Sequence, residues 1–168
     1  DADIRLSDKF SIKPNAAFSN NKNRGFITEI EGSLQNLGNT DLSFSPDVII
    51  GNMFIYNPLD NLQFTFLSKY VGEQFMSNLS SAVSEDDVLD SFFTSDINIV
   101  YQIKPKKIFK SITFTALINN VFNAEYVDRG YYGTFSFPDG NGNTVTGDFA
   151  GFYPQATRNF LVGMTLKF

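Results

Sequence analysis

The chain has 168 residues with neither cysteine nor histidine, which excludes a disulfide framework, a thiolate metal site and the commonest general base. Its 13 basic and 18 acidic residues leave a net charge of -5 without a basic stripe, so nucleic acid is not an expected partner. The 19 Phe and 7 Tyr residues suit a surface that meets lipid headgroups. No apolar run is long enough to predict a transmembrane helix.

Apolar and polar residues alternate with a period of two, which predicts β-strands rather than helices. The pattern predicts about six strands and part of another, in the ranges 2–6, 10–20, 48–56, 62–75, 96–103, 111–122 and 159–168. The one helical candidate is a short surface turn at 84–92, which Ser84 or Asp87 would cap.

The connections between these strands alternate in length. Short turns are expected at 7–8, 57–61 and 104–110, and long polar or glycine-rich stretches at 21–46, 78–92 and 127–156. This arrangement is typical of an up-and-down membrane barrel, whose hairpins turn tightly on one side and project on the other. The predicted fold class is therefore all-β, an antiparallel transmembrane β-barrel. Immunoglobulin-like sandwiches and lipocalin-type barrels share the pattern of alternating strands and stay open as alternatives.

Two segments near the C-terminus carry a more specific pattern. The first, 117–126, contains Asn120, Val121, Phe122, Asn123 and Tyr126, and the second, 151–160, contains Tyr153, Pro154, Arg158 and Asn159. Together with the terminal strand, they resemble the closing signature of TonB-dependent outer-membrane receptors. Farther upstream, the ranges 43–52 and 69–74 resemble, more loosely, receptors of this class from Bacteroidota-type bacteria.

The resemblance implies a barrel of about 22 strands, preceded by a plug domain and an energy-coupling box. Residues 1–168 are then the C-terminal portion of that barrel, about six to seven strands, with the plug and the N-terminal strands absent from this sequence. The chain opens without the basic start and apolar core of a signal peptide, which fits a mature chain or, in our interpretation, a fragment.

The resemblance also implies a function and a location. The expected function is uptake of a scarce nutrient with energy from the TonB system, at the outer membrane of a Gram-negative bacterium. The implied partners are outer-membrane lipid, the remainder of the barrel and plug, and the TonB complex acting through the missing plug. Neither enzymatic activity nor a cofactor is expected, and no ordinary nucleophile–base pair can be assembled without His or Cys.

The barrel strands carry the first candidate functional residues. The apolar set of the last strand is expected to face lipid and, by the resemblance, to be the signal read by the barrel-assembly machinery; it consists of Phe160, Val162, Met164, Leu166 and Phe168. The polar sets are expected to line the lumen, and they include Asn98, Gln102, Thr113, Thr115 and Asn159. The cargo is not predicted, because receptors for siderophores, cobalamin, glycans, peptides and haem share this ending.

The last long connection is rich in aromatic residues, namely Tyr126, Tyr131, Tyr132, Phe135, Phe137, Phe149, Phe152 and Tyr153. One interpretation is an extracellular surface that contacts ligand or a surface lipoprotein. The other, which we favour, is an aromatic girdle combined with packing inside the loop.

Three charged groups allow a functional and a structural interpretation. The segment 139–143 resembles a calcium loop, but Thr144 and Ala150 stand where such a loop has Gly and a bidentate Glu, so a flexible hairpin tip is favoured. The acidic group Glu85, Asp86, Asp87 and Asp90 is interpreted as a solvated loop. The lysines at a short turn are interpreted as interfacial anchors; they are Lys104, Lys106, Lys107 and Lys110.

Two alternatives to a receptor follow from the same pattern. The first is a complete small barrel of about eight strands with a structural or adhesive role, in which the first strand pairs with the last. The second is a soluble β-sandwich that acts as a binding module, in which the apolar set of the last strand lies inside a core.

Overall fold

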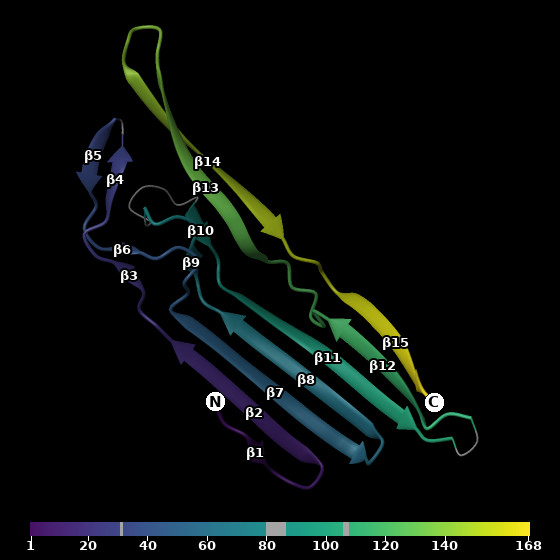
Figure 1. Cartoon of the computed structure of the whole chain (residues 1–168). Coiled ribbons are helices and arrows are strands. Elements are labelled where there is room, and N and C mark those ends of the chain that lie inside the picture. Colours follow the sequence, from purple (N-terminus) through teal and green to yellow (C-terminus); the bar gives the residue numbers. More distant parts are fainter. Residues whose placement is uncertain (31, 80–86, 106–107) are drawn as a thin grey trace.

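The computed structural model of the chain describes residues 1–30, 32–79, 87–105 and 108–168 (Figure 1). Seven strands form one antiparallel sheet in the order β1-β2-β7-β8-β11-β12-β15. They are β1 (Ile4–Arg5), β2 (Phe10–Phe18), β7 (Val48–Leu59), β8 (Leu62–Val71), β11 (Phe92–Ile103), β12 (Ser111–Asn119) and β15 (Asn159–Lys167). Within the described ranges, no helix has the length and apolar character needed to cross a membrane. The predicted all-β, antiparallel fold class is confirmed.

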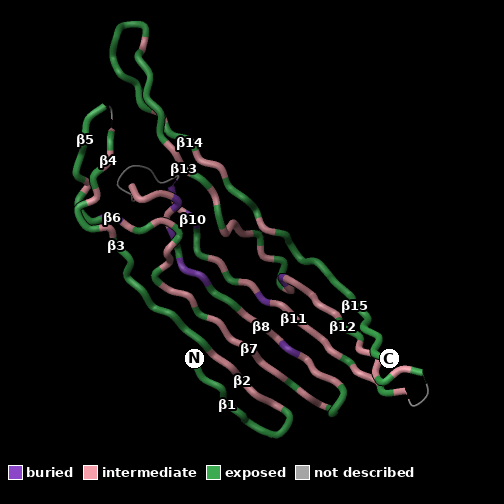
Figure 2. Tube along the Cα trace, viewed as in Figure 1, coloured by how far each residue is buried: buried purple, intermediate pink, exposed green. Residues whose placement is uncertain are grey.

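The sheet is a single open layer, as Figure 1 shows for the described part of the chain. β1 pairs with β2 and β15 pairs with β12, so the first and last strands form opposite edges and do not pair with each other. The buried apolar side chains of the described residues are only Val71, at the end of β8, and Met76 and Leu89, in the connection between β8 and β11. Most of the tube in Figure 2 has the colours of exposed or intermediate residues. A small closed barrel pairs its edge strands, and a sandwich buries a core between two sheets. Neither arrangement is present in the described residues.

Strand boundaries deviate from the prediction where the backbone requires it. β7 continues to Leu59 through an irregularity between Tyr56 and Leu59, so the predicted turn at 57–61 is too long and shrinks to Asp60 and Asn61. Pro58 lies in this irregularity, where its missing N–H breaks no regular ladder. β12 stops at Asn119 instead of continuing to residue 122, because Asn120 has a left-handed φ of 50°.

The long connections lie at one end of the sheet and contain short hairpins that the sequence pattern did not predict (Figure 1). Between β2 and β7, β3 (Lys22–Asn23) pairs with β6 (Thr40–Asp41), and β4 (Ile27–Ile30) pairs with β5 (Ser33–Asn36). Between β8 and β11, β9 (Gln74–Phe75) pairs with β10 (Val88–Leu89). Of the range predicted as a helical turn, Asp87 has 3₁₀ conformation, but Val88–Leu89 form β10 and Phe92 begins β11, so the prediction is wrong at those residues; residues 80–86 lie outside the described ranges.

The longest hairpin consists of β13 (Val127–Pro138) and β14 (Thr144–Pro154), and it projects away from the sheet (Figure 1). On one face of this hairpin each of three rings lies opposite a glycine, in the pairs Tyr131–Gly151, Phe135–Gly147 and Phe149–Gly133. A Cβ added at Gly147 would lie 2.6 Å from the Phe135 ring, and one added at Gly133 would lie 2.6 Å from the Phe149 ring. The glycines therefore make room for aromatic rings that cross from the opposite strand.

We expect Gly147→Ala to loosen this hairpin, because the new methyl group would displace the Phe135 ring at a cost of about 1 to 3 kcal/mol. The measurement is amide hydrogen exchange of β13 and β14 in the folded full-length protein. Gly140→Ala is the matched control, since a Cβ at this hairpin-tip position meets nothing within 4 Å. Equal exchange rates in the two variants would contradict the role of the glycines.

Candidate lipid-facing surface and loop clefts

One face of the sheet is apolar from edge to edge. Cross-strand partners share a face, and one row of partners contains an apolar residue in every strand: Ile4, Ile12, Phe54, Phe66, Ile97, Ile118 and Phe160. The next row toward the short turns contains Phe10, Tyr56, Phe64, Ile99, Ala116 and Val162. A surface of this width suits contact with acyl chains, because none of these side chains is buried: Ile4, Tyr56, Phe160 and Val162 are exposed and the others are half-buried.

The apolar set predicted for the terminal strand lies on this face. Its first four members pair with Ile118, Ala116, Phe114 and Ile112 of β12. The five side chains are between 39% and 80% exposed, and the Phe168 ring lies 5.0 Å from that of Phe109. These residues are therefore not packed inside a water-soluble core. Their contact with lipid and their role as an assembly signal stay predictions.

The polar residues predicted for the lumen lie together on the opposite face. Gln102 pairs with Thr113 and donates a hydrogen bond of 3.4 Å to its hydroxyl. Thr115 pairs with Val100 of β11. Asn98 is two residues before Val100 in β11 and therefore lies on the same face. Asn159 of β15 lies on this same face and pairs with Asn119. This face also carries apolar residues such as Ile55 and Leu161, so it is mixed rather than uniformly polar. Its position in a lumen stays a prediction.

Asn120, in the family-like motif, connects three parts of the chain. Its side chain is buried, accepts a 2.9 Å hydrogen bond from the Ala124 N–H and donates to the Ala124 carbonyl and, at 3.3 Å, to the Ala156 carbonyl. Its backbone N–H donates to the Asp96 carboxylate of β11 at 2.8 Å. Asn120 thereby holds the turn after β12 against both β11 and the segment that leads into β15.

The other motif residues extend this connection. Asn123 also has a left-handed φ, of 57°, and its side-chain oxygen accepts a hydrogen bond from the Arg158 N–H just before β15. Val121 donates its N–H to the Ser95 carbonyl of β11. Phe122 is exposed, with its ring 6.5 Å from that of Phe66 on the apolar face. The motif is thus a turn that ties the last two strands of the sheet together.

The predicted aromatic cluster divides into separate groups. Five of its rings share one face of the β13–β14 hairpin and contact one another; they are Tyr131, Phe135, Phe137, Phe149 and Tyr153. Tyr132 and Phe152 lie on the other face, where the Tyr132 hydroxyl donates to Asp148. Tyr126 precedes the hairpin and stacks on Phe92 with ring centroids 4.4 Å apart. Packing within the loop accounts for part of the cluster, but the five rings of the hairpin face are about half exposed.

Asp139 closes the tip of this hairpin. Its carboxylate accepts hydrogen bonds from the N–H groups of Asn141 and Asn143, each at 2.8 Å, and from the Asn143 side chain. These bonds, those of Asn143 foremost, lower the pKa of Asp139 below its ordinary value. The Asp139 carboxylate is thus engaged in hydrogen bonds within the hairpin tip. The described residues contain no group of three metal-ligating side chains. The structural interpretation of this segment is the one that the geometry supports.

The other predicted charged groups are only partly described, since Glu85, Asp86, Lys106 and Lys107 lie outside the described ranges. Asp87 is fully buried, which is the main cause of a raised pKa, and it accepts a hydrogen bond from the Ser77 hydroxyl. Asp87 is therefore not solvated as predicted, whereas Asp90 is exposed. Lys104 and Lys110 are exposed at the turn between β11 and β12.

Charge is distributed unevenly between the two ends of the sheet. The connections 19–47, 72–91 and 120–158 contain 13 of the 18 acidic residues but only four of the 13 basic ones, namely Lys22, Arg24, Arg129 and Arg158. Two of these four pair with nearby acids, Lys22 with Asp41 and Arg129 with Asp128. The Lys22 pair raises the pKa of that amine. The loop end is consequently strongly acidic, and the short-turn end is basic.

Two clefts open among the long connections. One, of about 560 Å³, lies between the β4–β5 hairpin and the polar face of the β13–β14 hairpin, where Thr134, Ser136 and Glu29 line it. The other, of about 680 Å³, lies between β10, the start of β11 and the base of β13, and we call it the β10–β13 cleft. Aromatic side chains and two carboxylates line it. No basic residue lines either cleft among the described residues.

Comparisons with protein families and with curated proteins find no match. The fold itself is that of an outer-membrane receptor barrel, as similarity to solved structures shows. The siderophore receptor PiuA of Acinetobacter baumannii matches 96% of this chain with a TM-score of 0.64 and 12% identity. The ferric-catecholate import receptor Fiu of E. coli K12 matches 95%, with a TM-score of 0.54 and 12% identity in its open form and 0.56 and 15% in its closed form. The chain spans about a fifth of the length of these receptors.

We expect Ile99→Arg to destabilise the full-length barrel in lipid vesicles by about 2 to 4 kcal/mol, because it places a charge among acyl chains. Val100→Arg is the matched control: Val100 is the next residue of β11 and lies on the opposite face beside Gln63 and Thr115. The measurement is urea unfolding followed by the loss of heat-modifiable gel mobility. Similar destabilisation by the two variants would contradict a lipid-facing role for the apolar face.

We expect Asn120→Ala to destabilise the protein by about 2 to 4 kcal/mol, because a buried residue loses its side-chain hydrogen bonds and alanine disfavours the left-handed backbone. The neighbouring Asn119→Ala is the control, since Asn119 makes a single exposed hydrogen bond, to Asn159. Its expected cost is below about 1 kcal/mol. Urea unfolding in vesicles measures both, and equal costs would show that Asn120 does not hold the turn.

Proposed function

We propose that this chain is the C-terminal barrel segment of an outer-membrane receptor that takes up a scarce nutrient with energy from the TonB system. The observation that carries the proposal is the seven-stranded sheet itself, with one face apolar in every strand and all long connections at one end. The receptor-barrel fold supports the proposal. So does the family-like motif, including the segments that resemble Bacteroidota receptors.

The two open edges of the sheet support a larger barrel around this segment. β1 and β15 each leave one edge unpaired within the described residues. In hydrocarbon, each unsatisfied backbone group costs several kcal/mol, so these edges need further strands beside them. We propose that the remainder of the barrel supplies those strands and encloses a plug domain. TonB would act on the receptor through that plug.

Further partners are proposed from the surfaces of this chain. The apolar face of β15 is the element that the barrel-assembly machinery would read, and outer-membrane lipid is the environment that the whole apolar face fits. The basic turn at 104–110 would lie at the periplasmic interface, where lysines anchor a barrel. The exposed rings of the β13–β14 hairpin offer a surface for a lipoprotein partner. Transport rather than catalysis is the activity proposed.

The test uses a strain that lacks the full-length receptor and a complemented strain. We expect the receptor in the outer-membrane fraction, and we expect the deletion to slow growth when one nutrient is limiting, with iron, haem, cobalamin, glycans and peptides tested in turn. Loss of TonB should produce the same defect, because the energy for uptake comes from that system. The proposal would be contradicted if the deletion strain grew like wild type under every limiting nutrient. It would also be contradicted if the receptor deletion slowed growth but loss of TonB did not.

A further inference from the structure

The β10–β13 cleft has walls made of aromatic rings. Phe92 and Tyr126 stack within it, with ring centroids 4.4 Å apart and planes inclined by 25°. Phe93 and Phe152 line the same cleft and are 50% and 48% exposed. The faces of aromatic rings carry the negative part of their quadrupole, so rings that converge on one cavity attract a cation and give nothing comparable to an anion.

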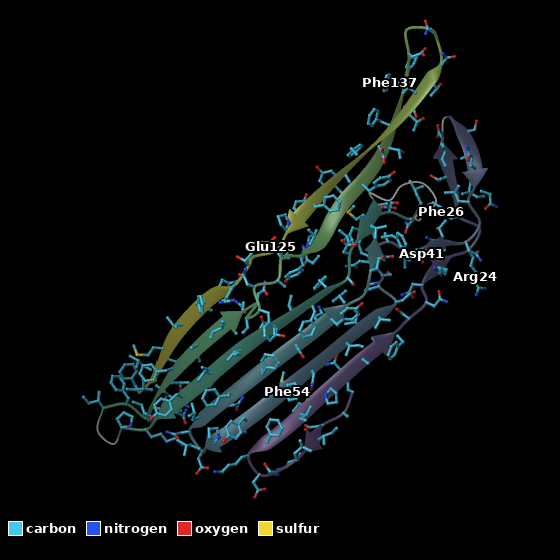
Figure 3. The ribbon with its side chains drawn as sticks, turned by 180° about the vertical axis from the view of Figure 1, so that it is seen from behind. Arg24, Phe26, Asp41, Phe54, Glu125 and Phe137 are labelled. Carbon is cyan, nitrogen blue, oxygen red and sulfur yellow. The ribbon has the colours of Figure 1, made fainter. Side chains whose placement is uncertain are left out.

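The charged residues of the cleft have the same sign as these ring faces. Asp90, directly after β10, and Glu125 are both exposed and both line the cleft. Figure 3 shows Glu125 near the base of the β13–β14 hairpin. The described lining contains no lysine or arginine. Burial, followed by the nearby carboxylates of Asp128 and Asp96, raises the pKa of Tyr126, which agrees with a negative potential at this position.

The surroundings reinforce this potential. The cleft lies at the acidic loop end, where the long connections hold 13 acidic and four basic residues. A field of one sign over a concave surface concentrates ligands of the opposite sign and speeds their association. The acidic residues of the long connections would repel an anionic ligand. They would attract a small organic cation toward the cleft, where the aromatic rings would then bind it.

We propose that the β10–β13 cleft binds an organic cation, in the form of a substituted ammonium group held against the outer side of the Phe92–Tyr126 stack and against Phe152, with Asp90 and Glu125 as its counter-ions. The inference deepens the proposed function, on which it rests, by naming the chemistry of a ligand group that the loop end accepts. A volume of about 680 Å³ accommodates such a group together with part of a larger ligand.

The test measures binding of choline to the full-length receptor purified in detergent, by isothermal titration. The comparison ligand is 3,3-dimethyl-1-butanol, which has the same shape without the charge. We expect choline to bind at least about tenfold more tightly than this neutral analogue. The double variant Asp90→Asn with Glu125→Gln should weaken choline binding by about tenfold and leave binding of the alcohol unchanged.

The matched control is the double variant Glu29→Gln with Asp148→Asn, which removes two acids from the loop end outside the cleft. We expect it to change choline affinity by less than about threefold, through the general field alone. Equal affinity for choline and the alcohol, or equal losses in the two double variants, would overturn the inference. A receptor that supports TonB-dependent growth but fails to bind choline overturns the inference alone, whereas a receptor absent from the outer membrane overturns the proposed function.

Discussion

The structure depends on one constraint, the alignment of alternating residues across seven strands. Each strand alone has only a weak preference for one face, but the pairing places Phe54 beside Phe66 and Ile118 beside Phe160, so that the preferences add. Because the side-chain period is two, a shift of one residue in the pairing of two strands would move every side chain of one strand to the opposite face of the sheet. The acyl chains of a membrane would then meet Thr and Asn side chains. The register is therefore the feature that a lipid environment specifies most strongly.

The register of the last pair of strands has an additional determinant. The turn after β12 is fixed by Asn120 to Asp96 on one side and to Ala156 on the other, and Asn123 holds the Arg158 N–H one residue before β15 begins. β15 is an edge strand of the sheet, with hydrogen-bond partners on one side only. The hydrogen bonds of the buried, left-handed Asn120 therefore add a local constraint on the register of β15 to the one that its pairing with β12 supplies.

Much of the sheet could be predicted from the sequence, because side chains of a strand alternate between its two faces and one face of this sheet is apolar in every strand. The hairpins in the loops could not. The strands β3, β4, β5, β6, β9 and β10 have only two to four residues each, too few for a readable period, and one face of β13–β14 alternates between aromatic residues and glycine instead of between apolar and polar residues. The spacing of Gly133, Gly147 and Gly151 against the rings was the available signal, and it becomes readable only once the pairing is known. The motif around Asn120 could be recognised but not explained, since its partners Asp96 and Ala156 are distant in sequence. The β10–β13 cleft was not predicted, because Asp90 and Glu125 are far apart in the chain and nothing local relates them.

The cleft and the sheet are not independent of each other. Phe92 is the first residue of β11, and Tyr126 follows the Asn120 turn by a few residues, so their stacked rings bridge the top of the sheet and the base of the hairpin. Asp96, which accepts the hydrogen bond from Asn120, is four residues after Phe92 in β11 and lies on the same face of the strand. Correct pairing of β11 with β12 is therefore a condition for bringing the two rings together. The register of the sheet therefore also determines where the aromatic side chains of the β10–β13 cleft lie.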